Sequence, residues 1–100
     1  MNNNIDNLFS LSGKIVVITG AVGLLGEKHA EAVAAYGGTP VLLDLSQTAV
    51  DLLAEKLNKQ YRVNAVGFSV DITNESKVKL VSDEVFKRFG KIDGLVNNAA

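Results

Sequence analysis

The 100-residue chain contains no cysteine, and this absence excludes several kinds of site. Without thiols the chain forms no disulfide and offers no thiolate-ligated zinc or iron–sulfur centre, and we predict no metal site. The lack of cysteine is compatible with a reducing compartment. Long hydrophobic runs are missing as well, because nowhere do about 18 apolar residues follow one another, the length that a membrane-spanning helix needs.

An excess of charge of one sign is also absent. Ten basic residues stand against eleven acidic ones, which leaves a net charge of -1. A nearly neutral chain has no electrostatic attraction for nucleic acids or anionic membranes, so neither is predicted as a partner. The start, Met1–Asn7, carries no basic residue and does not resemble a secretory signal, so we predict a cytoplasmic protein.

The composition that remains is that of one globular domain. Apolar residues make up 47% of the chain and charged residues 21%. From Gly13 onward, short apolar runs alternate with segments whose apolar residues recur every three or four positions. The predicted strands are 14–19, 40–44, 64–70 and 95–98; the predicted helices are 24–36, one N-capped by Ser46, and one leading from Asp71-Ile72-Thr73 through Val78, Val81 and Val85 to Gly90.

The order β-α-β-α-β-α-β predicts an α/β fold with a doubly wound parallel sheet, because parallel neighbours need a crossover connection. Right-handed crossovers would place the first two helices on one face and the third on the other. The fourth strand would then present an unpaired apolar edge, and we expect the segment alone to be incomplete and to aggregate or stay partly molten. We divide the chain into an arm, residues 1–12, and a domain, residues 13–100. Phe9 and Leu11 either anchor the arm or belong to a frayed terminus.

The segment Thr19–Gly26 is a glycine-rich turn between the first strand and the first helix. Such a turn lets the backbone approach a pyrophosphate and presents the unpaired amides of a helix N-terminus to it. In this interpretation Gly20 permits the tight turn, Gly23 keeps side chains off the phosphates, and Gly26 lets the helix pack closely. The alternative is an ordinary strand-to-helix turn, but the flanking strand and helix are the context that phosphate binding requires.

Four segments together resemble the short-chain dehydrogenases/reductases. They are Leu11–Lys14, Thr19–Gly26, Val70–Thr73, and Asn97–Ala100 after Lys91-Ile92-Asp93. The resemblance implies a Rossmann-type domain and an oxidoreductase that uses a nicotinamide cofactor on a hydroxyl or carbonyl substrate. It also implies a small-molecule substrate and a homo-oligomer.

The glycine spacing departs from the commonest subgroup of that family, in which a glycine would stand at position 24. This chain has Leu24, with the glycine one residue earlier at Gly23. That spacing resembles the extended subgroup, which includes nucleotide-sugar epimerases and dehydratases, whereas Asn97–Ala100 resembles the commoner subgroup. We give the later segment more weight, and the substrate class stays open.

Asp44 ends the second strand, where a carboxylate accepts hydrogen bonds from both ribose hydroxyls of an adenosine, the usual mark of NAD. Leu45, Ser46 and the loop offer no basic residue for the extra phosphate of NADP, which is therefore less favoured. The alternative for Asp44 is a solvated strand end or a helix cap.

By the resemblance, Asp71 binds the adenine amino group and Ile72 adds backbone contacts; the alternative for Asp71 is that it caps the third helix jointly with Thr73. Asn97 and Asn98 resemble the element that lines the cofactor ribose, braced by the Thr19 hydroxyl; for Asn98 a purely structural role is the alternative. The predicted cofactor-binding residues are Thr19, Gly20, Gly23, Leu24, Leu25, Gly26, Asp44, Leu45, Asp71, Ile72, Asn97, Asn98 and Ala99.

No catalytic residue is predicted. The family relies on a Tyr-x-x-x-Lys pair with a nearby serine, but Pro40 follows Tyr36 at the lysine spacing and Ala65 follows Tyr61. The lone His29 is interpreted as a surface or packing residue. Three functions remain: an NAD-dependent oxidoreductase, which we favour, an epimerase or dehydratase, and a non-catalytic dinucleotide-binding protein.

Overall fold

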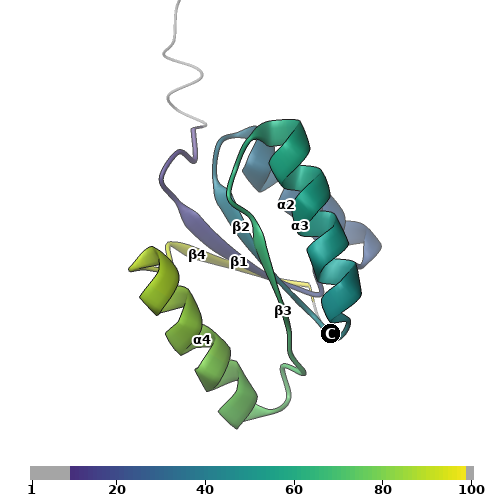
Figure 1. Cartoon of the computed structure of the whole chain (residues 1–100), viewed down its shortest axis with the longest axis vertical. Coiled ribbons are helices and arrows are strands. Elements are labelled where there is room, and N and C mark those ends of the chain that lie inside the picture. The colour runs from purple at the N-terminus through teal and green to yellow at the C-terminus, as the bar shows by residue number, and fades with distance from the viewer. Residues whose placement is uncertain (1–9, 99–100) are drawn as a thin grey trace, which may run out of the picture.

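Strands and helices alternate along the whole of the computed structural model, which describes residues 10–98 (Figure 1). This is the order that the apolar pattern predicts. The elements are β1 (Ile15–Thr19), α2 (Leu24–Ala35), β2 (Thr39–Asp44), α3 (Gln47–Tyr61), β3 (Val66–Ser69), α4 (Glu75–Phe89) and β4 (Gly94–Asn97).

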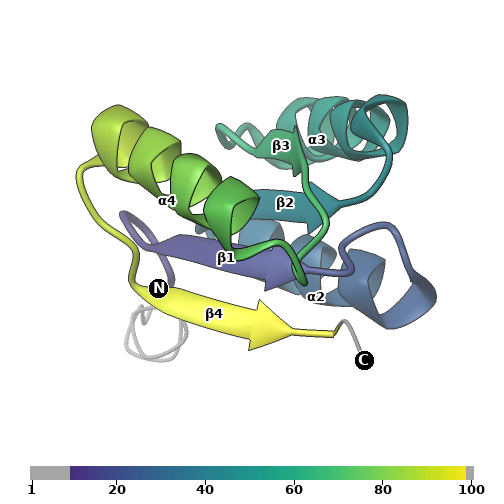
Figure 2. The same cartoon turned by 90° about the horizontal axis from the view of Figure 1, so that it is seen from below.

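The four strands form one parallel sheet in the order β3-β2-β1-β4. Val17 in β1 lies in register with Val41 on one side and Leu95 on the other. Figure 2 shows the strands running the same way, with β4 at one margin of the sheet and β3 at the other. The predicted α/β fold with a Rossmann-type parallel sheet is confirmed.

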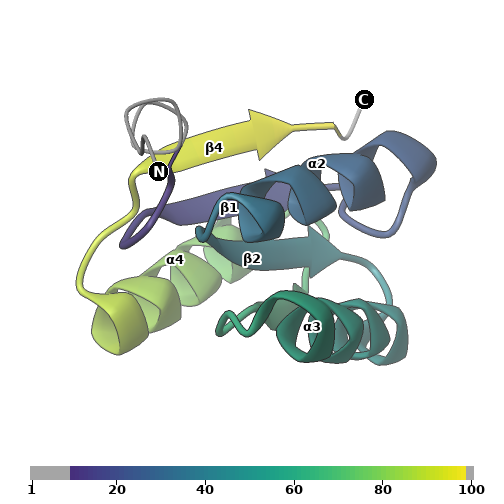
Figure 3. The same cartoon turned by 90° about the horizontal axis from the view of Figure 1, so that it is seen from above.

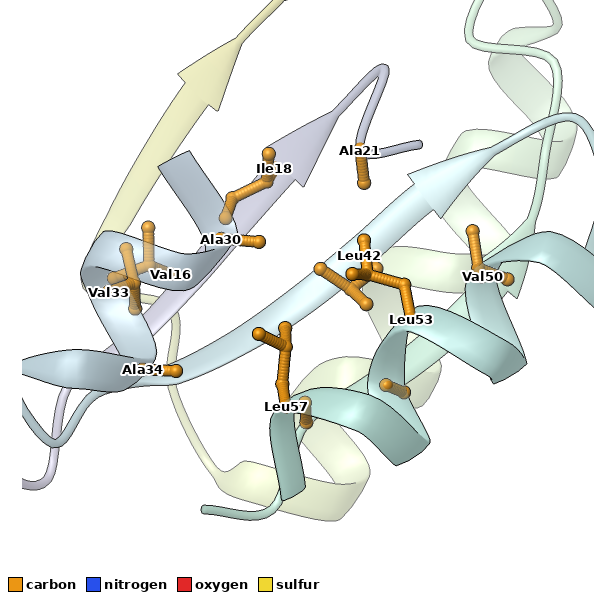
Figure 4. Packing of buried hydrophobic residues seen from close by; sticks show 12 residues of the cluster. Val16, Ile18, Ala21, Ala30, Val33, Ala34, Leu42, Val50, Leu53 and Leu57 are labelled. Carbon is orange, nitrogen blue, oxygen red and sulfur yellow. The ribbon is translucent and has the colours of Figure 1, made fainter. Parts of the chain in front are cut away.

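Both faces of β1 are buried, which explains its uninterrupted apolar run. Val16 and Ile18 pack toward α2 and α3, in a cluster that includes Leu42 and Leu57 (Figure 4). Ile15 and Val17 belong to the opposite cluster, which contains Val85 of α4. Successive side chains of a strand point to opposite faces of the sheet, so in a strand covered on both faces every side chain is buried and apolar residues follow one another.

The two faces of the sheet are covered unequally. Two helices, α2 and α3, cover one face, and α4 alone covers the other (Figures 1 and 3). Val85 is buried, and Val78 and Val81 pack partly buried beside it. A hollow of about 350 Å³ lies between α4 and β4, where the Leu95 side chain is 65% exposed. This is the half-covered face and apolar edge strand that the crossover argument predicts.

The helix ends agree with the sequence at two places and differ at a third. Ser46 caps α3 by accepting a hydrogen bond from the Ala49 N–H at 3.1 Å, and Gly90 ends α4 with φ +79°. The alternative role of Asp71, capping α4 jointly with Thr73, is ruled out. Asn74 caps this helix and accepts from the Lys77 N–H, because Asp71 and Thr73 are bonded to each other in the preceding turn.

Leu11 contacts the rest of the described chain. Its N–H donates to the Tyr36 carbonyl at 2.7 Å, and its side chain packs against the cluster beneath α2. The prediction for Phe9 lies outside the described residues. Between residues 10 and 98 no helix is long and apolar enough to cross a membrane.

Candidate functional site

The carboxyl ends of the parallel strands lie at the same end of the sheet (Figure 2). The predicted site residues lie at these strand ends or shortly after them. The loop 20–23 follows β1, Asp44 ends β2, Asp71 comes shortly after β3, and Asn97 ends β4. In open parallel sheets, ligands bind at the carboxyl ends of the strands.

The glycine loop makes a tight turn directly after β1. Gly20 has φ +61°, a conformation that side chains disfavour, and its carbonyl accepts from the Gly23 N–H at 3.1 Å. A Cβ at Gly26 would lie 2.0 Å from the Gly20 oxygen, so the first turn of α2 rests directly on the loop. This is the close approach predicted for Gly26.

Helix α2 begins without a side-chain cap. Gly23 occupies the N-cap position, and the first helical hydrogen bond runs from the Glu27 N–H to the Gly23 carbonyl. The N–H groups of residues 24–26 therefore have no acceptor within the helix, and the helix dipole adds partial positive charge. The Leu24 side chain is 80% exposed, so nothing apolar ties it to the core. A helix start of this kind suits an anion.

Asp44 ties the second strand to the glycine loop. Its Oδ2 accepts a hydrogen bond from the Val22 N–H at 3.0 Å, and its Oδ1 accepts from the Leu45 N–H at 2.8 Å. Ser46, not Asp44, caps α3, which removes the capping alternative. The link to Val22 was missed in the sequence, because the spacing of the glycines does not reveal which loop amide points at the end of β2.

A hollow of about 230 Å³ lies beside this carboxylate. Its lining includes Gly20, Asp44, Leu45, Asp71 and Ile72, so the structure brings these five predicted residues together. The hollow is smaller than the roughly 300–1,000 Å³ typical of sites for whole drug-sized ligands. It therefore suits one end of an extended ligand, such as a nucleoside group.

The Asp71 carboxylate is held in a turn. Its Oδ1 accepts hydrogen bonds from the Thr73 hydroxyl at 2.6 Å and from the Thr73 N–H at 2.9 Å. These bonds lower the pKa of Asp71 below its ordinary value, and the bond from the Thr73 hydroxyl contributes most. Asp71 thus stays ionised at neutral pH and able to accept further hydrogen bonds from a ligand.

Thr19 joins β1 to the end of β4. Its hydroxyl donates to Asn97 Oδ1 at 2.7 Å and accepts from the Asn98 N–H at 3.1 Å. This is the bracing that the resemblance implies for Thr19. Asn98 has a structural role through its main chain, while its buried side-chain Nδ2 has no acceptor among residues 10–98. Ala99 lies outside the described residues.

The remaining candidates do not join this site. His29 is half-buried in α2, does not line the hollow, and its Nδ1 has no hydrogen-bond partner within the described chain. Residues 10–98 contain no group of histidine and acidic side chains that could hold a metal ion. The polar groups that do converge are main-chain amides, which donate, and carboxylates, which accept, and with the close approach at Gly26 they fit a dinucleotide: amides for the pyrophosphate, carboxylates for the adenosine.

Fold and site together define a dinucleotide-binding α/β domain. The chain belongs to the short chain dehydrogenase family, whose model matches residues 14–100.

Individual relatives agree with this assignment. A sorbose reductase of Candida albicans is 37% identical over 97 residues, which are 97% of this chain and 34% of that protein. The 5-keto-D-gluconate 5-reductase of Escherichia coli is 32% identical over 94 residues, covering 94% of this chain and 37% of the relative. The chain thus spans about a third of the length of the curated relatives it matches.

Solved structures show the same fold. L-sorbose reductase from Gluconobacter frateurii, complexed with NADPH and L-sorbose, superposes with a TM-score of 0.87 at 33% identity. The match covers 92% of this chain and 35% of that structure. Similar structures include complexes with NADPH and with NAD, so similarity alone does not choose between the two cofactors.

Proposed function

We propose that the full-length protein is an NAD-dependent oxidoreductase that interconverts a hydroxyl and a carbonyl group in a small molecule. The observation that carries this proposal is the position of Asp44, fixed at the end of β2 by the Val22 N–H and adjoining the hollow that suits a nucleoside. A carboxylate in this place accepts hydrogen bonds from the free ribose hydroxyls of NAD.

The same carboxylate disfavours NADP. A 2′-phosphate carries about -1.5 to -2 charges at neutral pH. At about 4 Å from a carboxylate and an effective dielectric near 20, each unit of like charge costs about 4 kcal/mol before screening. If salt and side-chain movement remove half, about 2 kcal/mol remains, which is more than tenfold in affinity.

Basic side chains do not offset this repulsion. Lys56 lines a further hollow, which Val22 also lines, but its ammonium group is already paired with Glu27 at 3.0 Å and Glu31 at 3.5 Å. Glu27 lines the same hollow as Val22, so the charge of Lys56 is neutralised there. The charge distribution around Val22 therefore favours a ribose with a free 2′-hydroxyl.

In this account the chain supplies cofactor binding and orientation. The amides at the start of α2 hold the pyrophosphate, Asp44 and Leu45 adjoin the ribose, Asp71 and Ile72 adjoin the adenine, and Asn97 lies along the nicotinamide side. The bound nicotinamide supplies or accepts the hydride. Neither tyrosine of this chain has a lysine at the spacing of the family's Tyr-x-x-x-Lys pair, so we assign no general acid among these residues.

The named relatives suggest the class of substrate. A sorbose reductase, a 5-keto-D-gluconate reductase and a D-threitol dehydrogenase act on small polyhydroxylated molecules, so we propose a polyol or its keto form. The cytoplasmic location and the homo-oligomer stay predictions.

A second candidate is an epimerase or dehydratase, and the glycine spacing at Gly23 favours it. A steady-state assay of the full-length protein with NAD and, separately, a panel of polyols and a panel of nucleotide sugars distinguishes the two functions. An oxidoreductase accumulates NADH in proportion to the polyol consumed, whereas an epimerase or dehydratase recycles its cofactor and converts a nucleotide sugar without net NADH. Conversion of nucleotide sugars without NADH would contradict the proposed function, and binding without turnover of either class would favour a non-catalytic protein.

A further inference from the structure

Strand β3 lies at the margin of the sheet, so one row of its main-chain groups points away from β2 (Figure 2). The Val70 N–H donates to the Asp44 carbonyl, which directs residue 70 toward β2. The main-chain N–H and C=O groups of successive residues in a strand point in alternate directions. Those of Val66 and Phe68 therefore also point toward β2, and those of residues 65, 67 and 69 point away from the sheet. Such a row is a template for another strand.

Asn58 of α3 covers the first outward position. Its Oδ1 accepts from the Ala65 N–H at 2.6 Å, and its Nδ2 donates to the Ala65 carbonyl at 2.9 Å. The side-chain amide thus pairs with both main-chain groups of Ala65, as a residue of an adjacent strand would do.

Gln47, about three helical turns before Asn58, bonds to one main-chain group at each of the next two outward positions. Its Nε2 donates to the Gly67 carbonyl at 3.0 Å, and its Oε1 accepts from the Ser69 N–H at 2.9 Å. Nε2 also donates to Asp51 Oδ1 at 2.8 Å, which holds the amide in place. Two side chains of one helix therefore run along the outer margin of β3.

The opposite margin of the sheet has no such cover. The Asp93 N–H donates to the Ile15 carbonyl, so Gly94 and Val96 point their main-chain groups away from β1. Within residues 10–98 no side chain bonds to those groups. The two edges of one sheet thus differ in accessibility to a further strand.

We propose that α3 shields the β3 edge against strand addition through the side-chain amides of Gln47 and Asn58, so that copies of the protein do not associate through this edge. Main-chain groups that are already bonded to side-chain amides cannot pair with a second chain without first breaking these bonds. The inference does not depend on the cofactor or the reaction.

The test compares two substitutions of the exposed Gln47 in the full-length protein. Both Gln47→Ala and Gln47→Lys remove the bonds to Gly67 and Ser69, but only the lysine leaves a charge at the edge that discourages pairing. Gln60→Ala is the matched control, because Gln60 lies on the same helix and bonds to Tyr61 rather than to β3.

Sedimentation velocity over a range of protein concentrations provides the main measurement. We expect Gln47→Ala to form larger species as concentration rises, while Gln47→Lys and Gln60→Ala keep the wild-type distribution. Two results overturn the proposal: Gln47→Ala sediments like the wild type, or Gln47→Lys associates as strongly as Gln47→Ala, which would trace association to lost stability.

Hydrogen exchange at the Ser69 amide provides an independent measurement. We expect exchange about tenfold faster in both Gln47 variants, since the acceptor of this N–H is gone, and unchanged exchange in Gln60→Ala. Unchanged exchange in Gln47→Ala would show that Gln47 does not cover the edge.

Discussion

Gly26 in the first turn of α2 and Gly20, directly after β1, approach each other so closely that only glycine fits at position 26. A Cβ at position 26 would lie 2.0 Å from the Gly20 oxygen and 2.8 Å from the Gly20 carbonyl carbon, both main-chain atoms. Main-chain atoms cannot move aside as a flexible side chain can. Any larger residue at position 26 must therefore displace the helix or the loop.

Gly26→Ala should consequently weaken both cofactor binding and folding. Forcing extra volume into a packed region typically costs about 1–3 kcal/mol, and here the displaced element also holds the phosphate-binding amides. Urea unfolding and NAD titration of the full-length variant measure the two effects.

Leu24→Gly is the matched control two residues earlier. The Leu24 side chain is exposed, so we expect only the roughly 0.5–1 kcal/mol that a helical glycine costs. If Leu24→Gly damages NAD binding as much as Gly26→Ala, the account of the loop is wrong.

Thr19→Val should destabilise the junction of β1 and β4 by about 1–3 kcal/mol. Valine has the shape of threonine, but it leaves Asn97 Oδ1 without its 2.7 Å donor and the Asn98 N–H without its acceptor. Thr19→Ser keeps the hydroxyl and loses about 0.8 kcal/mol for one buried methyl group. Equal losses in urea unfolding would contradict the role of the hydroxyl.

Asp93 should make folding stability depend on pH in the acid range. Its Oδ2 accepts from the Ile15 N–H at 2.7 Å, and this bond, followed by the one from Lys91, lowers the pKa of Asp93 below 3.8. Because the pKa is lower in the folded state, the bonds stabilise the protein above the unfolded pKa and are lost as pH falls through the folded pKa.

The expected result is that Asp93→Asn is less stable than the wild type near neutral pH, and that the difference in unfolding free energy shrinks as pH falls below 3.8 and through the lower folded pKa. Asp83→Asn, an exposed carboxylate of α4, serves as the control for general charge effects. Unfolding curves across this range decide the matter; a difference that does not change with pH would count against the Asp93 prediction.

Arg62→Gly should stabilise the protein by about 0.5–1 kcal/mol. Arg62 ends α3 with φ +57°, a left-handed conformation that costs a non-glycine residue about 1–2 kcal/mol, partly offset by the greater freedom of glycine in the unfolded chain. Gly90 occupies the equivalent position after α4, and nothing lies within 4 Å of its missing Cβ. Gly90→Ala should therefore lower the free energy of unfolding through backbone strain alone. If Arg62→Gly is less stable than the wild type in urea unfolding, the argument is contradicted.

The sequence predicts the fold well because the burial of strands and the packing of helices determine the spacing of apolar residues along the chain. The unbroken apolar run of β1 indicates a strand covered on both faces, and the glycines of the loop indicate a close helix. Parallel pairing places Thr19 and Asn97 next to each other at the carboxyl ends of β1 and β4, since both residues end their strands.

Other features depend on three-dimensional contacts that no local pattern encodes. The bond from Val22 to Asp44 depends on how the loop turns, and the cover of β3 by Gln47 depends on the register between a helix and an edge strand. The cap of α4 could not be read from the sequence because Asp71, Thr73 and Asn74 are all good capping residues, and only the turn between them selects Asn74.

The most direct measurement for the central claim is a pair of titrations with NAD and NADP at fixed ionic strength on the full-length wild type and on Asp44→Asn, with Asp83→Asn as control. Asparagine keeps an acceptor for the Val22 N–H but removes the charge. We predict that the wild type binds NAD more than tenfold tighter than NADP, and that Asp44→Asn narrows this ratio while Asp83→Asn leaves it unchanged. Equal affinity of the wild type for both cofactors would contradict the role of Asp44 and the NAD-dependent function built on it.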